Sequence, residues 1–599
     1  MSLSSGVVVF FFLYEKQRGR IAPPGFTHQT APMGGGWLCV GASPGSGARV
    51  TMGDGGKVGL TEIWHGSGQR VRSRIEASEV AGGVRIEAER ALDGARRVYV
   101  ARVPGGVAFA SHVAVLKSLG LSVQVEESSL AEAMLYRFVM APRTLFRGIG
   151  QLRAGERRQI DVDDRGVREQ TLAVFRAEAG TGQVRAEEAG DRIWDQLLAV
   201  HRAYGIKAAE FGTLLSGGLD SSILTMIGAA LYDRKRTYSC SYGLEPAESD
   251  RELQYARTAA AWLGTEHEVL VPTRAEYLHS VIDCALDAEQ SSLHLQSALV
   301  NLVVRERLAP GGVRTWTCGE GADGVFGQKI QRLVGEFDRR PLAKFGLGLG
   351  LSRVVLGRIS AMTNRYGMLA DMAGRVWGPG IDIRDPRHVL WSTAIFGERE
   401  WVGRHMKGDP TAGRVECLSP YADGSDHEKF FALNLLGEVT ETQCVWASES
   451  ERSGVEAIYP FTAPEFVSEV NKVPWELRLE RPKGLLRDTS VRKGLPRGIA
   501  ERPKASFDIR PSFYGPRGSI LDPLVRVSAG GFDAGLLDSL RSTNVFRSQM
   551  FFTALNVGLV RRHFELGHTR EQLHEELNAS IRDLGVWEQM TASAQVSAG

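Results

Sequence analysis

A short stretch in the first half of the chain constrains the fold more than any other. Residues 212–224 read GTLLSGGLDSSIL, which is an apolar run, a glycine pair and a segment with helical spacing. This pattern predicts a buried strand, a tight turn and the start of a helix. Gly217 and Gly218 let the backbone approach an anion closely, and the free N–H groups of the new helix carry the positive end of its dipole. The stretch therefore predicts a phosphate-binding site.

The polar residues of this turn indicate the ligand. Ser216 and Ser221 add hydroxyl donors, whereas the carboxylate of Asp220 would repel a polyphosphate unless a divalent cation lay between them. Asp220 therefore predicts Mg²⁺. The turn is not a Walker loop, because it is shorter than that pattern and no lysine follows its second glycine. The alternative interpretation is a glycine turn with a helix cap, which occurs in many α/β proteins.

A second acidic glycine turn lies farther along the chain. Residues 317–327 read TCGEGADGVFG and follow the apolar piece VRTW. If both turns end strands of one parallel sheet, they face each other across the crevice where such sheets bind ligands. Asp220 and Asp323 would then hold Mg²⁺ between them. Strand, helix and strand patterns at 236–244, from Ser249 onward, and at 265–269 also favour a doubly wound parallel sheet.

The two motifs SGGLDSS and GEGADGVFG together resemble the synthetase domain of class B, glutamine-hydrolysing asparagine synthetases, which belong with the ATP pyrophosphatases. This resemblance implies cleavage of ATP between its α and β phosphates, with Asp220 and Asp323 as ligands of Mg²⁺. Tyr242 follows a predicted strand at the place of the family's adenine pocket, although a core aromatic is the other interpretation. The implied ATP contacts are Leu214, Ser216, Gly217, Gly218, Leu219, Asp220, Ser221, Tyr242, Cys318, Gly319 and Lys483.

Three further residues are implied to act in catalysis. Glu320 matches the glutamate of asparagine synthetase-like members, where the β-lactam synthetases carry a tyrosine; a carboxylate there can orient an ammonium and accept its proton. Glu456, in GVEAIYPF, matches the family's GVE-x-x-x-PF segment, with Ile458 in place of the usual arginine. Glu456 would line the acyl site or serve only as an ion-pair partner.

Two lysines match the family's lysine-bearing motifs. Lys504, in ERPKASF, is expected to stabilise the oxyanion and the leaving pyrophosphate, because a fixed cation favours both charges. Lys483, in PKGLLR, and Arg502 are expected to support the phosphates. A solvated basic loop is the other interpretation of Lys504.

Length and composition limit the classes of protein to which the chain can belong. A chain of 599 residues predicts at least two domains, which we place at residues 1–180 and 181–599. A formal charge of +2 gives no reason to expect nucleic acid as a partner. The six cysteines are scattered without metal spacing, and the apolar run 7–14 is too short to span a bilayer. We expect a cytoplasmic enzyme with no membrane span.

The first domain is glycine-rich with short strand patterns, for example 98–103 and 107–111 around a Pro-Gly-Gly turn. Its end, residues 136–155, resembles the end of the family's glutamine amidotransferase domain, which implies an Ntn-type αββα fold. The family's nucleophile is an N-terminal cysteine, but Met1 here is followed by Ser2. We therefore expect a degenerate scaffold domain, with Ser2 as the alternative nucleophile.

The combination of a degenerate glutaminase, a retained amide-forming domain and an enlarged middle region at 329–430 resembles the lasso peptide macrolactam synthetases. The resemblance implies adenylation of an Asp or Glu side chain in a leaderless core peptide and capture by the peptide's N-terminal amine. A leader peptidase and a leader-recognition protein would be partners. Asparagine synthetase using ammonia is the first alternative; a β-lactam synthetase is disfavoured by Glu320. A non-catalytic scaffold is opposed by Asp220, Asp323 and Lys504.

Overall fold

The structure is a computed structural model of the chain. Tyr242, Lys504 and Ser2 lie outside the residues that it describes. The described residues are 10–15, 26–42, 48–53, 57–64, 70–180, 182–232, 236–240, 246–327, 331–332, 335, 397–502 and 514–584.

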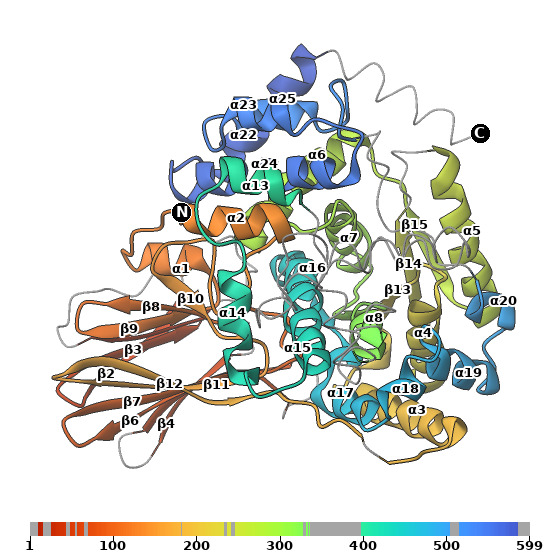
Figure 1. The fold of residues 1–599 in the computed structure, drawn as a ribbon, viewed down its shortest axis with the longest axis horizontal. Helices are drawn as coiled ribbons and strands as arrows, with labels where there is room; N and C mark the ends of the chain where they lie inside the picture. The colour runs from red at the N-terminus through yellow and green to blue at the C-terminus, as the bar shows by residue number, and fades with distance from the viewer. Residues whose placement is uncertain are drawn as a thin grey trace, which may run out of the picture.

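Two six-stranded antiparallel sheets form the N-terminal region (Figure 1). The first has the order β10-β8-β9-β1-β3-β2 and contains the predicted hairpin, in which Tyr99 pairs with Ala110 and Val103 with Gly106. Its strands are β1 (Phe10–Glu15), β2 (Thr27–Met33), β3 (Gly36–Ala42), β8 (Tyr99–Val103), β9 (Gly106–Ala110) and β10 (Ile149–Gln151).

The second sheet has the order β12-β11-β7-β6-β5-β4. Its inward side chains, among them Leu60 and Ile86, pack against Phe12 and Val40 of the first sheet in one apolar core. Alternate burial along β11 shows the period of two that such packing requires. The strands are β4 (Ala48–Gly53), β5 (Lys57–Ile63), β6 (Val71–Val80), β7 (Gly83–Arg90), β11 (Glu156–Asp163) and β12 (Gly166–Val174).

Helices α1 (Val113–Ser118) and α2 (Glu127–Tyr136) cover the outer side of the first sheet (Figure 1). Buried ion pairs join the antiparallel region to helix α16 (Thr440–Arg452). Arg96 lies 2.6 Å from Glu451, and Arg97 lies 2.6 Å from Glu441. Because breaking a buried pair leaves a charge without compensation, these contacts oppose separation of the two regions.

The five-stranded sheet that follows is parallel throughout, with the order β15-β14-β13-β16-β17. The chain runs outward from β13 to β15 and then returns to place β16 on the other side of β13. The direction therefore switches between β13 and β16, which is where such sheets bind ligands. The strands are β13 (Phe211–Leu214), β14 (Arg236–Cys240), β15 (Glu266–Leu270), β16 (Thr315–Thr317) and β17 (Glu456–Ile458).

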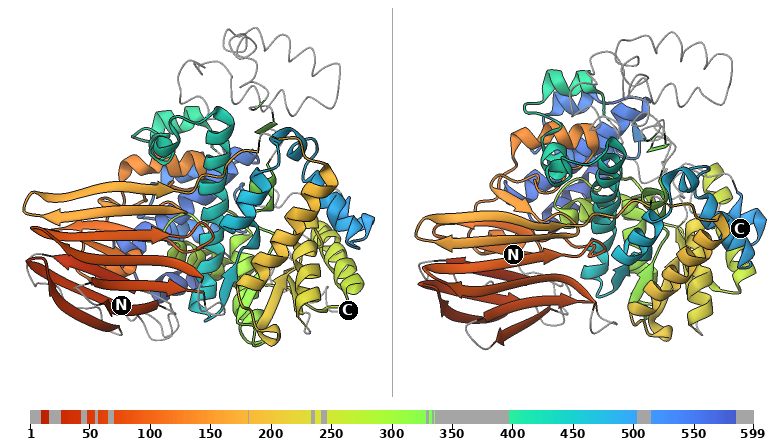
Figure 2. Two further views of the ribbon diagram at one scale, coloured as in Figure 1. Left: turned by 90° about the horizontal axis from the view of Figure 1, so that it is seen from below. Right: turned by 60° about the horizontal axis from the view of Figure 1, so that its bottom comes forward.

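Helices cover both faces of this sheet (Figure 2). Helices α4 (Leu219–Leu231) and α5 (Pro246–Leu263) lie on one face, with α3 (Ala186–Ala203) packed on α4. Helix α7 (Ser297–Val303) and its π-helical extension η2 (Val304–Leu308) lie on the other face together with α16 and α6. The bounds of α6 are Arg274–Ala288.

The remaining helical elements surround this core, and α24 packs on α6 with its middle fully buried. They are η1 (Ala208–Glu210), α8 (Ala322–Phe326), α13 (Arg399–His405), α14 (Ala412–Leu418), η4 (Ser419–Tyr421), α15 (Asp426–Leu433), η5 (Asn434–Val439), η6 (Pro460–Thr462), α17 (Pro464–Asn471), α18 (Trp475–Arg478), α19 (Gly484–Arg492), α20 (Arg497–Ala500), α22 (Asp522–Ser528), α23 (Ala534–Ser539), α24 (Val545–Phe564) and α25 (Arg570–Asp583).

The predicted α/β class is confirmed, with antiparallel sheets first and a parallel sheet after them. One boundary was predicted wrongly, because α5 already begins at Pro246, before the helix start expected at Ser249. Proline is well suited to a first helical turn, where its missing N–H costs no hydrogen bond. In the parts of the chain that the structure describes, no helix combines the length and apolar character that crossing a bilayer demands.

Candidate active site

The first glycine turn connects β13 to α4 and is stabilised by hydrogen bonds between its own residues. Ser221 Oγ accepts a hydrogen bond from the backbone N–H of Ser216 at 3.2 Å and lies 3.1 Å from Ser216 Oγ. Gly217 has a φ of 67°, and a Cβ there would lie 2.3 Å from the backbone of Tyr255. Only glycine fits this close approach, so the turn lies directly against the backbone of α5.

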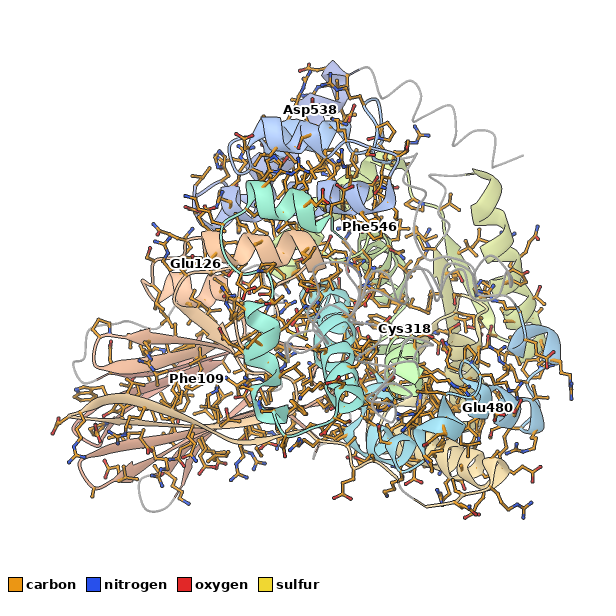
Figure 3. All side chains as sticks on the ribbon, viewed as in Figure 1. Phe109, Glu126, Cys318, Glu480, Asp538 and Phe546 are labelled. Atoms are coloured by element: carbon orange, nitrogen blue, oxygen red, sulfur yellow. The ribbon has the colours of Figure 1, made fainter. Side chains whose placement is uncertain are left out.

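The second glycine turn connects β16 to α8 and lies directly against the first. A Cβ on Gly319 would lie 2.8 Å from Cβ of Asp220 and 2.9 Å from the backbone nitrogen of Ser221. Gly321 has a φ of 98°. Cys318, labelled in Figure 3, lies in the interior beside α8. Two turns that are far apart in the sequence therefore touch through their backbones.

One lysine joins the two acidic residues. Lys483 Nζ lies 2.5 Å from Oδ2 of Asp220 and 2.9 Å from Oδ1 of Asp323. The lysine precedes α19 with a left-handed φ of 51° and is buried. Burial lowers the pKa of Lys483, but the attraction of both carboxylates outweighs it, so its pKa lies above the ordinary value. The lysine is therefore an ammonium that bridges the two turns.

The pair of carboxylates suits Mg²⁺ as well as an ammonium. Oxygen ligands are those that Mg²⁺ prefers, and it commonly takes one or two carboxylates together with phosphate oxygens and water. In the described part of the chain, no cluster of three or more His, Cys, Asp or Glu side chains has the arrangement of a metal site. If Mg²⁺ binds here, Asp220 and Asp323 would hold it together with phosphate oxygens and water.

A cavity of about 310 Å³ opens at this edge of the sheet. Eleven of the implied ATP, metal and catalytic residues line it, and Gly217 completes the turn behind them. These eleven are Leu214, Ser216, Gly218, Leu219, Asp220, Ser221, Cys318, Gly319, Glu320, Asp323 and Lys483.

Two arginines add positive charge to the wall of the cavity. The guanidinium of Arg502 lies over the ring of Tyr255, 4.3 Å from its centroid. Arg487 donates a hydrogen bond to the carbonyl oxygen of Ala500. Together with Lys483 they place three cationic residues in the lining of the cavity, and cations of this kind bind phosphate groups.

The structure places Glu456 in β17. Glu456 is the first residue of β17 and pairs in register with Thr315, whereas the cavity opens beyond the last residues of the strands. Its carboxylate lies 3.6 Å from Arg72 of β6, which also lies 3.8 Å from Glu62. The contact with Arg72 is compatible with the ion-pair interpretation, and a role of Glu456 at the acyl site stays a prediction.

Several lining residues carry no motif and were not anticipated. Gln296, three residues of α7 and Trp446 of α16 are among the residues that line the cavity. No local pattern marks these residues, because a short apolar helix looks the same whether it covers a core or a ligand. Only the return of the chain from β15 to β16 brings them to the crevice.

The fold and the cavity define an α/β protein with two acidic glycine turns at the switch point of a parallel sheet. The family model of asparagine synthase matches residues 198–526, more than half of the chain. The chain belongs to this family.

Two curated relatives are similar to this part. Asparagine synthetase [glutamine-hydrolyzing] 1 of Bacillus subtilis (strain 168) is 24% identical over 235 residues, which are 39% of this chain and 36% of the relative. Asparagine synthetase [glutamine-hydrolyzing] of Triphysaria versicolor is 24% identical over 215 residues, 34% of this chain and 33% of the relative. The chain thus spans about a third of the length of the relatives that it matches.

Proposed function

We propose that this chain is an ATP-dependent carbon–nitrogen ligase that primes a carboxylate as an acyl adenylate and passes it to an amine. This proposal rests on one observation: Asp220 and Asp323, which come from two different glycine turns, both contact the ammonium of Lys483 in the lining of the cavity. Membership of the asparagine synthase family supports the same chemistry.

In the first step, a carboxylate oxygen of the substrate attacks the α-phosphorus of ATP, and pyrophosphate leaves. Lys483 places its ammonium beside the two aspartates, where it can neutralise the charge that collects on the departing phosphates. Mg²⁺ held by Asp220 and Asp323 would supply further charge neutralisation at the phosphates. Lys504, outside the described residues, is proposed to stabilise the same charge.

In the second step, the amine nitrogen attacks the acyl carbon, AMP leaves and an amide remains. The attacking nitrogen must lose a proton. Glu320 lines the cavity next to Gly319 and is the proposed acceptor of that proton. A carboxylate also attracts an ammonium before it reacts, which orients the nucleophile.

The proposed substrate is a leaderless core peptide, closed into a macrolactam between an Asp or Glu side chain and the N-terminal amine. Such an enzyme must hold a folded peptide next to its cavity. The enlarged middle region at 329–430 supports this proposal by its composition, since it contains many basic and apolar residues. A leader peptidase and a leader-recognition protein are the proposed partners.

The antiparallel region is proposed to be a degenerate glutaminase-like domain of the αββα type, spanning residues 1–180 and followed by the ligase domain at 181–599. Two facing antiparallel sheets with α1 and α2 on one outer side support this proposal. The ligase domain is proposed to be of the ATP-pyrophosphatase type. An asparagine synthetase using ammonia is the second candidate, because both curated relatives are named as asparagine synthetases, of the glutamine-hydrolyzing kind.

The test incubates the protein with Mg·ATP and each candidate acceptor, and follows pyrophosphate release and product mass. A synthetic leaderless peptide that loses one water supports the macrolactam proposal. Aspartate that gains an amide nitrogen from ammonia supports the second candidate instead. Pyrophosphate release by wild type but not by the Asp323→Asn variant ties either activity to the described cavity. Absence of turnover and of ATP binding contradicts the ligase proposal.

A further inference from the structure

The second glycine turn packs on two elements that follow it in the chain. A Cβ on Gly321 would lie 2.8 Å from Cγ2 of Thr462 in η6 and 3.3 Å from Nε2 of Gln443 in α16. With its φ of 98°, Gly321 brings the backbone of the turn directly onto these two side chains. Both side chains are fully buried, and neither is among the residues that line the cavity. They therefore contact the turn and not a ligand.

Gln443 and Thr462 form a closed ring of hydrogen bonds with Tyr459. Gln443 Nε2 donates to Thr462 Oγ1 at 3.0 Å, and Thr462 Oγ1 donates to the carbonyl oxygen of Tyr459 at 3.1 Å. The hydroxyl of Tyr459 closes the ring, because it donates to the carbonyl oxygen of Gln443 at 3.2 Å. Thr462 Oγ1 also lies 3.2 Å from Gln443 Oε1. Since all three residues are buried, loss of one link leaves a polar group without its partner and weakens the ring.

Glu320 immediately precedes Gly321 and lines the cavity. Its backbone N–H donates a hydrogen bond to Cys318 Sγ, so the turn is held on both sides of the Glu320 side chain. Burial raises the pKa of Tyr459 well above its ordinary value, with further increases from the neighbouring Cys318 and Glu320 side chains. The ring therefore lies within electrostatic range of the Glu320 carboxylate.

The aspartate of the same turn has attachments of its own. Asp323 lies in the first turn of α8, and its Oδ1 is 2.9 Å from Lys483. Gly324 packs closely on η5, since a Cβ there would lie 2.4 Å from Cγ2 of Val439. A weakened ring should therefore displace Glu320 more than Asp323.

We propose that Thr462 and Gln443 are positioning residues for amide formation. The ring that they form with Tyr459 fixes the backbone at Gly321 and thereby holds the Glu320 carboxylate where it accepts the proton of the attacking amine. Proton transfer needs the two heavy atoms at about 3 Å, and a displacement of about 1 Å is enough to slow a reaction greatly. This inference rests on the ligase function and concerns its second step alone.

Thr462→Val tests the ring, because valine has the shape of threonine and lacks its hydroxyl. The acyl substrate is whichever of L-aspartate, L-glutamate and a synthetic leaderless peptide supports exchange of pyrophosphate into ATP by wild type. The amine is ammonium for the amino acids and the N-terminus for the peptide. The variant is expected to keep exchange and Mg·ATP affinity within about threefold of wild type, and to form the amide about tenfold or more slowly.

Two further substitutions separate the ring from general effects on the core. Thr462→Ser keeps the hydroxyl and is expected to form the amide within about threefold of the wild-type rate. Thr553→Val is the matched control, because Thr553 is a fully buried threonine of α24 whose hydroxyl has no partner among the described residues. Its rates of exchange and amide formation are expected to equal those of wild type.

Glu320→Gln decides whether Thr462 acts through Glu320. Alone, this change is expected to slow amide formation about a hundredfold, and adding Thr462→Val should slow it by less than about twofold more. With the peptide substrate, the defect of Thr462→Val should also narrow between pH 7 and pH 9. An N-terminal amine loses its proton near pH 8, and an amine without that proton depends less on Glu320.

Four results overturn the proposal. Amide formation by Thr462→Val at the wild-type rate would refute it outright, and a loss of Mg·ATP affinity alone would assign the ring to Asp323. Independent effects in the double variant, or a defect that is constant with pH, would make the role of Thr462 structural.

Crystal structures of wild type and Thr462→Val provide a test that needs no substrate. The Glu320 carboxylate is expected to be displaced in the variant while Asp323 keeps its place, and an unchanged Glu320 would contradict the proposal. By contrast, absence of exchange with every carboxylate, together with absence of ATP binding by wild type, would refute the ligase function itself.

Discussion

Replacement of Lys483 by methionine removes a cation that joins the two acidic turns. The change keeps the length of the side chain and takes away its charge. Nζ lies 2.5 Å from Asp220 and 2.9 Å from Asp323, so the two carboxylate oxygens on either side of it face each other across a short gap. Without the ammonium, two like charges remain there.

The loss of folding stability in Lys483→Met can be worked out from that geometry. Two unit charges about 5 Å apart repel by about 3 kcal/mol at an effective dielectric constant of about 20. Asp323 has 42% of its side chain exposed, so water and salt screen part of this repulsion. The variant loses the attraction between the ammonium and the carboxylates, but it also avoids the free-energy cost of removing the ammonium from water, and the two effects largely cancel. We expect Lys483→Met to lower the free energy of unfolding by about 1–2 kcal/mol in Mg²⁺-free buffer.

Urea unfolding followed by tryptophan fluorescence measures this loss. The matched control is Lys472→Met, which removes an exposed lysine 3.1 Å from a single partner, Glu469, and is expected to cost less than about 0.5 kcal/mol. High salt should narrow the difference between Lys483→Met and wild type, and Mg²⁺ should stabilise the variant more than wild type. A variant no less stable than Lys472→Met, or a loss independent of salt and Mg²⁺, would refute the reasoning.

Three further changes test other parts of the structure. Gly319→Ala places a Cβ 2.8 Å from Asp220 and is expected to lower the affinity for Mg·ATP about tenfold or more, because it forces the two turns apart. The control Gly403→Ala, with open space at its Cβ, is expected to leave this affinity unchanged. Equal affinities of the two variants would contradict the close approach of the turns. Glu456→Gln is expected to keep the rate of pyrophosphate exchange within about threefold of wild type, since its carboxylate faces Arg72; a loss of about a hundredfold would restore its catalytic role. Burial lowers the pKa of His201 to about 4, so the unfolded chain binds the proton more tightly and stability falls as pH drops below about 6.5. His201→Phe should reduce that fall between pH 7 and pH 5 by about 2 kcal/mol in urea titrations, and parallel profiles would show that His201 is protonated in the folded state.

The two glycine turns could be predicted from the sequence because their signals are local. A short apolar strand, a glycine pair and an acid at the first helical turn occupy about a dozen consecutive residues in each case. The parallel order of the strands followed from the same alternation of strand and helix. The positions of Asp220 and Asp323 against each other then required only the switch of direction between β13 and β16.

The remaining features depend on contacts that no local pattern encodes. Lys483 was expected at the phosphates, but its bridge between two carboxylates depends on a left-handed residue that holds α19 against both turns. The role of Glu456 stays a prediction, because a motif gives the strand and not which of its ends meets the cavity. Gln296 was missed because its amide is unusual only once its buried surroundings are known.

The central claim is that Asp220 and Asp323 act together on one nucleotide, and equilibrium binding of Mg·ATP tests it most directly. Isothermal titration should give binding to wild type and a loss of about tenfold or more in affinity in both Asp220→Asn and Asp323→Asn, with the double variant little worse than either single one. Binding to both single variants with wild-type affinity would contradict the account.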